Sequence, residues 1–166
     1  MRFMAPATVL VVDDDPVILK LLEVNFEMEG FEVVRAADGA EGLERARAVL
    51  PDIVILDVMM PRMTGYEVAK ALREDEYTAH IPIIFVTARA QSQDVERGME
   101  LGVDDYVTKP FDPLDLIARV NTLLARSQAA AEANGERAPG PGEPTDAPGP
   151  IVPAAGNPDR PEGRSL

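Results

Sequence analysis

Between residues 7 and 126, short apolar runs alternate with amphipathic stretches five times, and this alternation restricts the possible folds more than any other feature. The runs are rich in Val and Ile and have the length of buried strands. They are Thr8–Val12, Phe31–Ala36, Ile53–Leu56, Ile83–Thr87 and Val103–Val107. Five strand–helix repeats predict an α/β fold: a doubly wound, five-stranded parallel sheet with helices on both faces.

The amphipathic stretches carry local signals for helix starts and ends. Asp15–Pro16 and Asp112–Pro113 each have the pattern of an N-cap followed by Pro at the first helical position. Thr64 and Glu67 have the spacing of a capping box. Glycines that end helices are expected at Gly30 and Gly102. The apolar residues expected on the buried faces of the first and last helices are Ile18, Leu21, Leu22, Phe26, Leu116, Ile117, Val120 and Leu123.

The composition changes near Ser127. From there to Leu166, Ala, Pro, Gly and Glu dominate, and the large aliphatic residues are limited to Ile151, Val152 and Leu166. Such a segment buries too little apolar surface to offset the entropy cost of ordering it. We therefore expect one domain over residues 7–126 and a disordered tail over residues 127–166, without an output module in that tail.

The net charge of −13 argues against direct binding of nucleic acid, because an acidic chain repels a phosphate backbone. The absence of cysteine excludes disulfides and thiolate metal sites and agrees with a cytoplasmic location. No window approaches the ~20 apolar residues that a membrane span needs. The amino terminus lacks the pattern of a signal peptide, since Pro6 interrupts its short apolar stretch.

Polar residues collect where the apolar runs end. Asp13–Asp15 follows the first run, Asp57 follows the third, Thr87 ends the fourth and Lys109–Pro110 follows the fifth. Taken singly, each has an ordinary explanation as a helix cap, a turn residue or a surface lysine. Because binding sites of open α/β sheets lie beyond the carboxyl ends of the strands, we expect these side chains to form one site.

The chemistry of such a cluster points to phosphoryl transfer. Crowded carboxylates favour a hard cation, and an incomplete oxygen shell that keeps waters suits Mg²⁺. Lys109 offers a positive charge and Thr87 a hydroxyl to phosphoryl oxygens. A carboxylate is also a nucleophile toward phosphoryl groups. The only histidine, His80, precedes Ile81–Pro82 in a predicted loop and is not expected to be functional.

Four segments resemble the signature of response-regulator receiver domains, in the family's order and spacing. They are Val11–Pro16 (VVDDDP), Leu56–Pro61 (LDVMMP), Val86–Ala88 (VTA) and Tyr106–Phe111 (YVTKPF). The resemblance covers residues 7–126 and implies a flavodoxin-like fold with five helices and strand order 2-1-3-4-5. Thr64 stands where the family often has Asp, which we interpret as an exchange of one helix cap for another.

The resemblance also implies roles for individual residues in the site. Asp57 would be the phosphoacceptor. Asp14 and Asp57 would bind Mg²⁺ directly with the backbone carbonyl of Met59, and Asp13 would bind it through water. Lys109 would pair with the phosphoryl group.

Further roles implied by the resemblance concern switching and lifetime. Thr87 moves toward the phosphoryl group, and the ring of Tyr106 turns inward to fill the vacated space. Lys109–Pro110 is expected to be a cis peptide, since such bonds are nearly confined to Pro. Met59 and Arg89 flank the path of an attacking water, so they are expected to tune the lifetime of the aspartyl phosphate.

The leading hypothesis is a stand-alone, chemotaxis-type regulator that is a switch and not an enzyme, assisting only its own phosphorylation and dephosphorylation. A sensor histidine kinase or phosphotransfer protein would phosphorylate Asp57, and binding of a downstream protein would change at the fourth helix, fifth strand and fifth helix, around residues 91–126. The alternative is a haloacid-dehalogenase-like phosphatase with Asp13 as nucleophile and Asp15 as acid. A receiver that binds constitutively is a third hypothesis, which the complete site disfavours.

The same face bears on the oligomeric state. Asp105 and Arg119 have the identities needed for one intersubunit ion pair between receivers that dimerise there. Val95 and Asn121, however, stand where charged partners would be expected. We therefore predict a monomer or a weak dimer.

Overall fold

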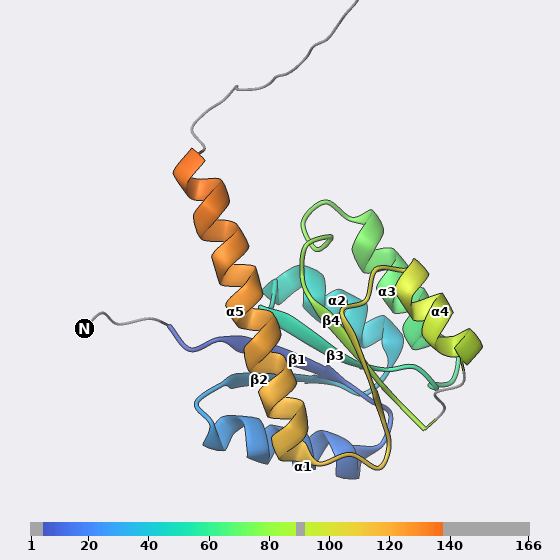
Figure 1. Cartoon of the computed structure of the whole chain (residues 1–166). Helices are drawn as coiled ribbons and strands as arrows, with labels where there is room; N and C mark the ends of the chain where they lie inside the picture. Colours follow the sequence, from blue (N-terminus) through green and yellow to red (C-terminus); the bar gives the residue numbers. More distant parts are fainter. Residues whose placement is uncertain (1–4, 89–91, 138–166) are drawn as a thin grey trace, which may run out of the picture. The chain divides into compact units, whose positions relative to one another are not determined.

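The computed structural model describes residues 5–88 and 92–137. The chain divides into two compact units, Met1–Ala125 and Arg126–Leu166. The strands, all in the first unit, are β1 (Thr8–Val12), β2 (Glu32–Ala36), β3 (Ile53–Asp57), β4 (Ile83–Thr87) and β5 (Asp105–Thr108) (Figure 1). The helices are α1 (Pro16–Met28), α2 (Gly39–Val49), α3 (Gly65–Glu74), α4 (Ser92–Glu100) and α5 (Pro113–Arg137).

The strands form one parallel sheet in the order β2-β1-β3-β4-β5, which confirms the expected flavodoxin-like topology. The ends of neighbouring strands lie side by side: Val12, the last residue of β1, pairs with Ala36 on one side and with Leu56, the residue before Asp57, on the other. Thr87 likewise pairs with Thr108. The residues that end the strands therefore share one edge of the sheet, here called the carboxyl edge.

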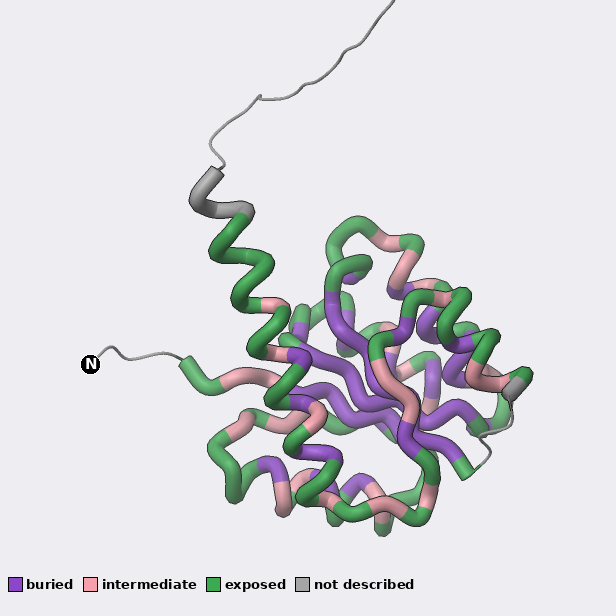
Figure 2. Tube along the Cα trace, in the orientation of Figure 1, coloured by how far each residue is buried: buried purple, intermediate pink, exposed green. Residues whose placement is uncertain are grey.

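Alternate residues of each strand face opposite sides of the sheet and build two cores. Leu10 and Val12 pack with residues of α2 and α3, whereas Val9 and Val11 pack with residues of α1 and α5. Figure 2 shows the buried segments gathered in the strands, with exposed positions along the outer helix surfaces. This two-sided burial explains why the strands read as nearly continuous apolar runs.

The predicted helix ends are confirmed. Asp15 caps α1, its side chain accepting a hydrogen bond from the backbone N–H of Val17. Thr64 and Glu67 form the expected capping box at the start of α3. Gly30 and Gly102 have φ angles of 92° and 77°, in the left-handed region that favours glycine.

Two local predictions were wrong. On α1 the buried face holds Leu19 with Leu22 and Phe26, while Leu21 is 38% exposed. The helix carries apolar residues around most of its circumference, so periodicity alone did not select the face. The fifth strand begins at Asp105 and not at Val103, because the Val103 N–H donates to the Gly98 carbonyl at the end of α4.

The prediction of disorder from residue 127 onward was wrong for the start of the tail. Helix α5 continues to Arg137, so residues 127–137 are helical and not disordered. The segment Gln128–Ala133 is rich in Ala, the strongest helix former, and the first Gly and Pro after Ser127 come only at positions 135 and 139. The composition averaged over the whole tail concealed the difference between this Ala-rich start and the Pro- and Gly-rich remainder. Residues 138–166 lie outside the described part of the chain.

None of the helices described has both the length and the apolar character that crossing a membrane requires.

Candidate functional site

The carboxyl edge of the sheet brings the predicted site residues together. Asp13 follows β1, Asp57 ends β3, Thr87 ends β4 and Lys109 follows β5. Asp13, Asp57 and Thr87 are buried, with exposed fractions of 3%, 4% and 0%. Polar groups this deeply buried in an apolar sheet are costly unless they are paired or serve a function.

Three carboxylates meet at this edge. Asp13, Asp14 and Asp57 each offer an oxygen, and these oxygens lie within 4.8 Å of one another. Lys109 Nζ is 3.0 Å from Asp13 Oδ2 and 3.7 Å from Asp57 Oδ2. One cation thus faces three anions, so the cluster retains an excess of negative charge.

Each buried carboxylate is also held by a backbone amide. The N–H of Asp15 donates to Asp13 Oδ1 at 2.9 Å, and the N–H of Met59 donates to Asp57 Oδ1 at 3.3 Å. Both amides lie two residues after the carboxylate that they bind, as in an Asx turn. These turns fix the orientation of the carboxyl groups.

Burial and crowding of these charged groups shift the pKa values of Asp57 and Lys109. Burial, followed by the charge of Asp13, raises the pKa of Asp57 to about 7, although Lys109 and the Met59 N–H act in the opposite direction. Burial by itself would lower the pKa of Lys109, but its hydrogen bond with Asp13 and the nearby carboxylates raise it overall. Lys109 is therefore a permanent cation, whereas Asp57 lacks sufficient positive charge around it.

The donor set suits a hard divalent cation. Three carboxylates supply only oxygen, as Mg²⁺ and Ca²⁺ prefer. A single lysine faces these carboxylates, so the cluster keeps negative charge that a cation would offset. The residues present therefore fit the Mg²⁺ that the resemblance to receiver domains implies.

The loop between β3 and α3 folds back tightly onto Asp57. A Cβ atom at Gly65 would lie 2.5 Å from the Asp57 carbonyl oxygen, so only glycine fits there. The Gly65 N–H donates to the Val58 carbonyl at 2.9 Å, and Arg62 adopts a positive φ of 70° within the loop. This close approach keeps Met59 beside the acceptor, with a side chain that is 48% exposed.

The predicted switch residues lie on the adjacent strands. The carbonyl of Thr87 accepts a hydrogen bond from the Lys109 N–H at 2.8 Å, and the Lys109–Pro110 peptide is cis as expected. Tyr106 is half-buried, and its ring packs edge-on against Phe85 with centroids 5.8 Å apart. Arg89, predicted to tune the phosphoryl lifetime, lies outside the described residues.

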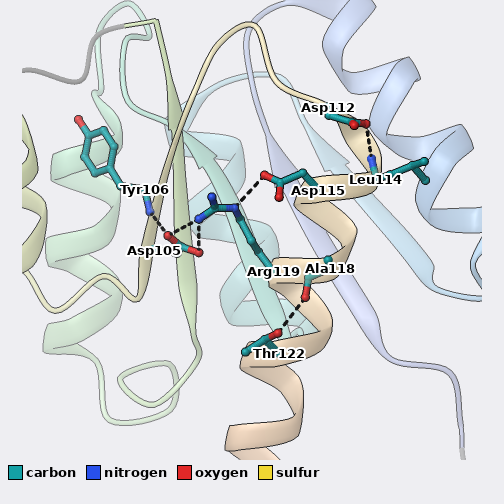
Figure 3. A network of polar contacts seen from close by, with 8 residues as sticks. All are labelled: Asp105, Tyr106, Asp112, Leu114, Asp115, Ala118, Arg119 and Thr122. Carbon is teal, nitrogen blue, oxygen red and sulfur yellow. Dashed lines mark hydrogen bonds and ion pairs between the residues drawn. The ribbon is translucent and has the colours of Figure 1, made fainter.

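The α4–β5–α5 face contains an ion-pair network centred on Arg119 (Figure 3). Arg119 Nη1 donates to both carboxylate oxygens of Asp105 at 2.9 Å, and its Nε donates to Asp115 at 2.9 Å. The pair considered for a contact between subunits therefore forms within one chain.

His80 is exposed and belongs to no cluster among the residues described.

Sequence reasoning placed Asp13, Asp14, Asp57, Thr87 and Lys109 at the carboxyl edge, where the structure has them, but missed some of their contacts. It assigned Lys109 only to the phosphoryl group, whereas Asp13 is its nearest carboxylate partner. The Asx turns were missed as well, although an Asp two residues before the donating amide is a recognisable signal.

Comparison with known proteins agrees with this geometry. Residues 9–121 match the family model described as response regulator receiver domain. The chain is 44% identical over 125 residues to the DNA-binding dual master transcriptional regulator RpaA of Synechocystis, covering 75% of this chain and 52% of RpaA. It is 46% identical over 123 residues to the regulator PhoP of Bacillus subtilis, covering 74% and 50%. The chain thus spans about half the length of these relatives.

Solved structures show the same fold. The chemotaxis protein CheY4 of Vibrio cholerae superposes with a TM-score of 0.69 at 35% identity, covering 71% of this chain and 98% of CheY4. A CheY-like receiver domain protein of Methanospirillum hungatei gives a TM-score of 0.72 at 28% identity, covering 75% and 98%. The chain therefore belongs to the response regulator receiver domain family of two-component systems.

Proposed function

We propose that Asp57 accepts a phosphoryl group from a phosphohistidine of a sensor kinase or phosphotransfer protein, and that the resulting aspartyl phosphate changes the binding of a downstream protein. One observation carries the proposal. Asp57 is a buried carboxylate at the end of β3, with a lysine and two further carboxylates beside it. A merely structural aspartate would not be placed in so crowded and acidic a position.

The chain's own residues account for the transfer. A carboxylate oxygen of Asp57 attacks the phosphorus atom, an O–P bond forms, and the P–N bond to the donor histidine breaks with its electron pair leaving on the histidine nitrogen. Lys109 pairs with the negative charge of the phosphoryl oxygens, and the Thr87 hydroxyl donates a hydrogen bond to one of them. The fixed Asx turn at Met59 holds the acceptor in place during the attack.

Asp13, Asp14, Asp57 and the carbonyl of Met59 are the groups that would hold Mg²⁺. When bound, the ion supplies positive charge that offsets the carboxylates and the incoming phosphoryl oxygens. Asp13 contributes from the side of Lys109, with which it shares a hydrogen bond.

The readout belongs to the α4–β5–α5 face. Tyr106 of β5 connects this face to the acceptor edge, because its strand ends beside the lysine that faces Asp57. The acidic net charge favours a protein partner over direct contact with nucleic acid, although RpaA is itself a DNA-binding regulator. The partner reads the rearranged surface and does not contact the phosphoryl group.

Labelling with acetyl phosphate tests the acceptor. Asp57→Asn should abolish the label, because the carboxylate nucleophile is lost while the shape is kept. Asp13→Asn should only weaken it, because Asp13 assists from beside the lysine. Mass spectrometry locates the modified residue. A label that persists in Asp57→Asn on Asp13 would instead support the phosphatase alternative.

The side chain of Met59 should set the lifetime of the phosphorylated form. An aspartyl phosphate is lost when water attacks the phosphorus in line, and a bulky apolar side chain at this position excludes water and cannot orient it. The half-exposed Met59 has the size and position for this role. We assign the second shielding position to Arg89 from the family resemblance.

The lifetime is measured by labelling the protein, removing the donor and following the decay. The parent should persist for minutes to hours, and a Met59→Asn, Arg89→Glu double variant should decay faster by a factor of a few to about ten for each position, or up to ~1.4 kcal/mol of barrier. A Met28→Asn variant, altered at an exposed methionine on α1, serves as control. Equal decay of parent and double variant would disprove the shielding role.

A further inference from the structure

Helix α4 is attached to the domain mainly by polar and aromatic contacts. Within residues 93–100, Gly98 is the only buried position, and Val95 is half-buried. By contrast, α3 buries Tyr66, Val68 and Leu72. A groove of about 230 Å³ further separates the two helices, lined by Tyr66, Glu67, Lys70, Arg97, Glu100 and Leu101. A helix with so little buried apolar surface is among the first elements of a domain to move.

Tyr66 of α3 is held by α4 from two sides. Its hydroxyl donates a hydrogen bond to Asp94 Oδ1 at 3.2 Å, and Arg97 Cζ lies 4.0 Å from the centroid of its ring. The other carboxylate oxygen, Asp94 Oδ2, is buried without a hydrogen-bond partner among the described residues. Asp94 is half-buried, and the Tyr66 hydroxyl donates to it from α3, so losing this hydrogen bond would favour release of α4.

An aromatic row connects this contact to the switch residue. The ring of Tyr66 packs edge-on against Phe85 of β4 at 5.5 Å, and Phe85 packs edge-on against Tyr106 of β5 at 5.8 Å. The backbone of α4 rests directly on Phe85, since a Cβ atom at Gly98 would lie 3.2 Å from that ring. Phe85 therefore touches α4, Tyr66 and Tyr106 together.

We propose that Tyr66, Asp94 and Arg97 form a latch that holds α4 against α3 and thereby opposes the phosphorylated arrangement of Tyr106. The inference rests on the proposed function and adds its regulation. Tyr106 is half-buried, and the family resemblance implies that its ring turns inward on phosphorylation. That turn moves the ring against Phe85, whose opposite contacts are fixed while the latch is closed. Opening the latch and turning Tyr106 inward are therefore linked equilibria, and weakening one favours the other.

The test removes only the hydroxyl, with Tyr66→Phe. Hydrogen exchange of the backbone amides in α4 should become faster, while exchange in α3 stays at the parent rate. The affinity for beryllofluoride with Mg²⁺, titrated by NMR, should increase about three- to tenfold, the equivalent of one ordinary hydrogen bond. Asp94→Ala, which removes the acceptor, should act in the same direction, and the double variant should add less than the sum of the two. Tyr77→Phe, at a tyrosine that is 66% exposed, is the matched control.

Each result bears on the latch. Unchanged exchange in α4 of Tyr66→Phe overturns it, and faster exchange with unchanged beryllofluoride affinity overturns its coupling to the switch. A parent protein that does not bind beryllofluoride at all refutes the proposed function and the coupling with it. In that case the exchange measurement still shows whether Tyr66 retains α4, so the two failures are distinguishable.

Discussion

The two edges of the sheet differ in how well their charged groups are paired with opposite charges. At the amino edge, where the strands begin, charged groups meet opposite charges or backbone dipoles. At the carboxyl edge, three carboxylates share one lysine, and the pKa of Asp57 rises to about 7. The same sheet thus has one edge that favours the folded state and one that opposes it.

Arg73 is the central group of the amino edge. Its guanidinium is 19% exposed and donates hydrogen bonds at 2.7–3.3 Å. The acceptors are the carbonyl oxygens of Ala79, Ile81 and Gly102 and the carboxylate of Asp104. Asp104 in turn accepts from the N–H of Ile83, where β4 begins. One side chain thereby ties α3 to the segments that lead into β4 and β5.

The two edges therefore have different roles, one in stability and one in the candidate site. The amino edge ties the loops to the strand starts, so the carboxyl edge can keep an unfavourable cluster without unfolding the domain. The cost of that cluster is one that a bound cation would offset. Three predictions measure this difference between the edges, in order of decreasing effect.

Arg73→Ala should destabilise the domain by about 2–4 kcal/mol, because it removes the hydrogen bonds to Ala79, Gly102 and Asp104 and to the carbonyl of buried Ile81. Urea unfolding of the two proteins measures the loss. Arg47→Ala is the control, since Arg47 is 51% exposed and pairs only with Asp75 among the described residues, a contact worth about 0–1 kcal/mol. A loss at Arg73 no larger than the loss at Arg47 would remove the contrast between the edges.

Asp57→Asn should stabilise the metal-free domain at pH 8 by about 1–3 kcal/mol, because a buried charge is removed. The sign of the pH dependence follows from the raised pKa. Between pH 4 and 7 the folded parent holds a proton that the unfolded chain has lost, so the parent loses stability as the pH rises, by at most about 1.4 kcal/mol per pH unit.

The measurement compares unfolding of the parent and Asp57→Asn in EDTA across this range. Below pH 4 the two proteins should unfold alike, since the carboxyl group is then neutral in both states. A difference that stays constant from pH 4 to 8 would show that Asp57 carries no electrostatic strain.

Asp14→Ala should have the smallest effect. Asp14 is exposed, so removing its charge should raise the melting temperature of the metal-free domain by only about 1–4 °C. Mg²⁺ should stabilise the parent by mass action and the variant much less. Calorimetry with and without 10 mM MgCl₂ checks both, with Ca²⁺ as a second ion. An apo melting temperature that falls in the variant would argue against repulsion in the cluster.

Much of the fold was predictable because its signals are local. The strand runs, the caps at Asp15 and Thr64 and the glycine at Gly102 each depend on a few neighbouring residues. The burial of Leu19 in place of Leu21 was not, because a helix apolar on several sides is oriented by its tertiary neighbours. The helix through Arg137 was missed because a composition averaged over the tail hides an Ala-rich start.

The sequence predicted which residues of the site lie close together. It did not predict which of them form hydrogen bonds or ion pairs with one another. Parallel strands bring their carboxyl ends to one edge, so Asp13, Asp57 and Lys109 had to lie near one another. Arg73, at the opposite edge, gave no sequence signal, because its acceptors are mostly backbone carbonyls and any residue supplies a carbonyl. The contact between Tyr66 and Asp94 likewise joins positions whose distance depends on how two helices pack.

The ion pair between Asp105 and Arg119 has a consequence for self-association. Because it is already made within the chain, a second copy that engaged Arg119 would exchange one ion pair for another of the same kind. Such an exchange is close to neutral in free energy, so a dimer through this face must draw its affinity from apolar contacts. Its dissociation constant should therefore change little with ionic strength, unlike that of a dimer held by newly formed charge pairs.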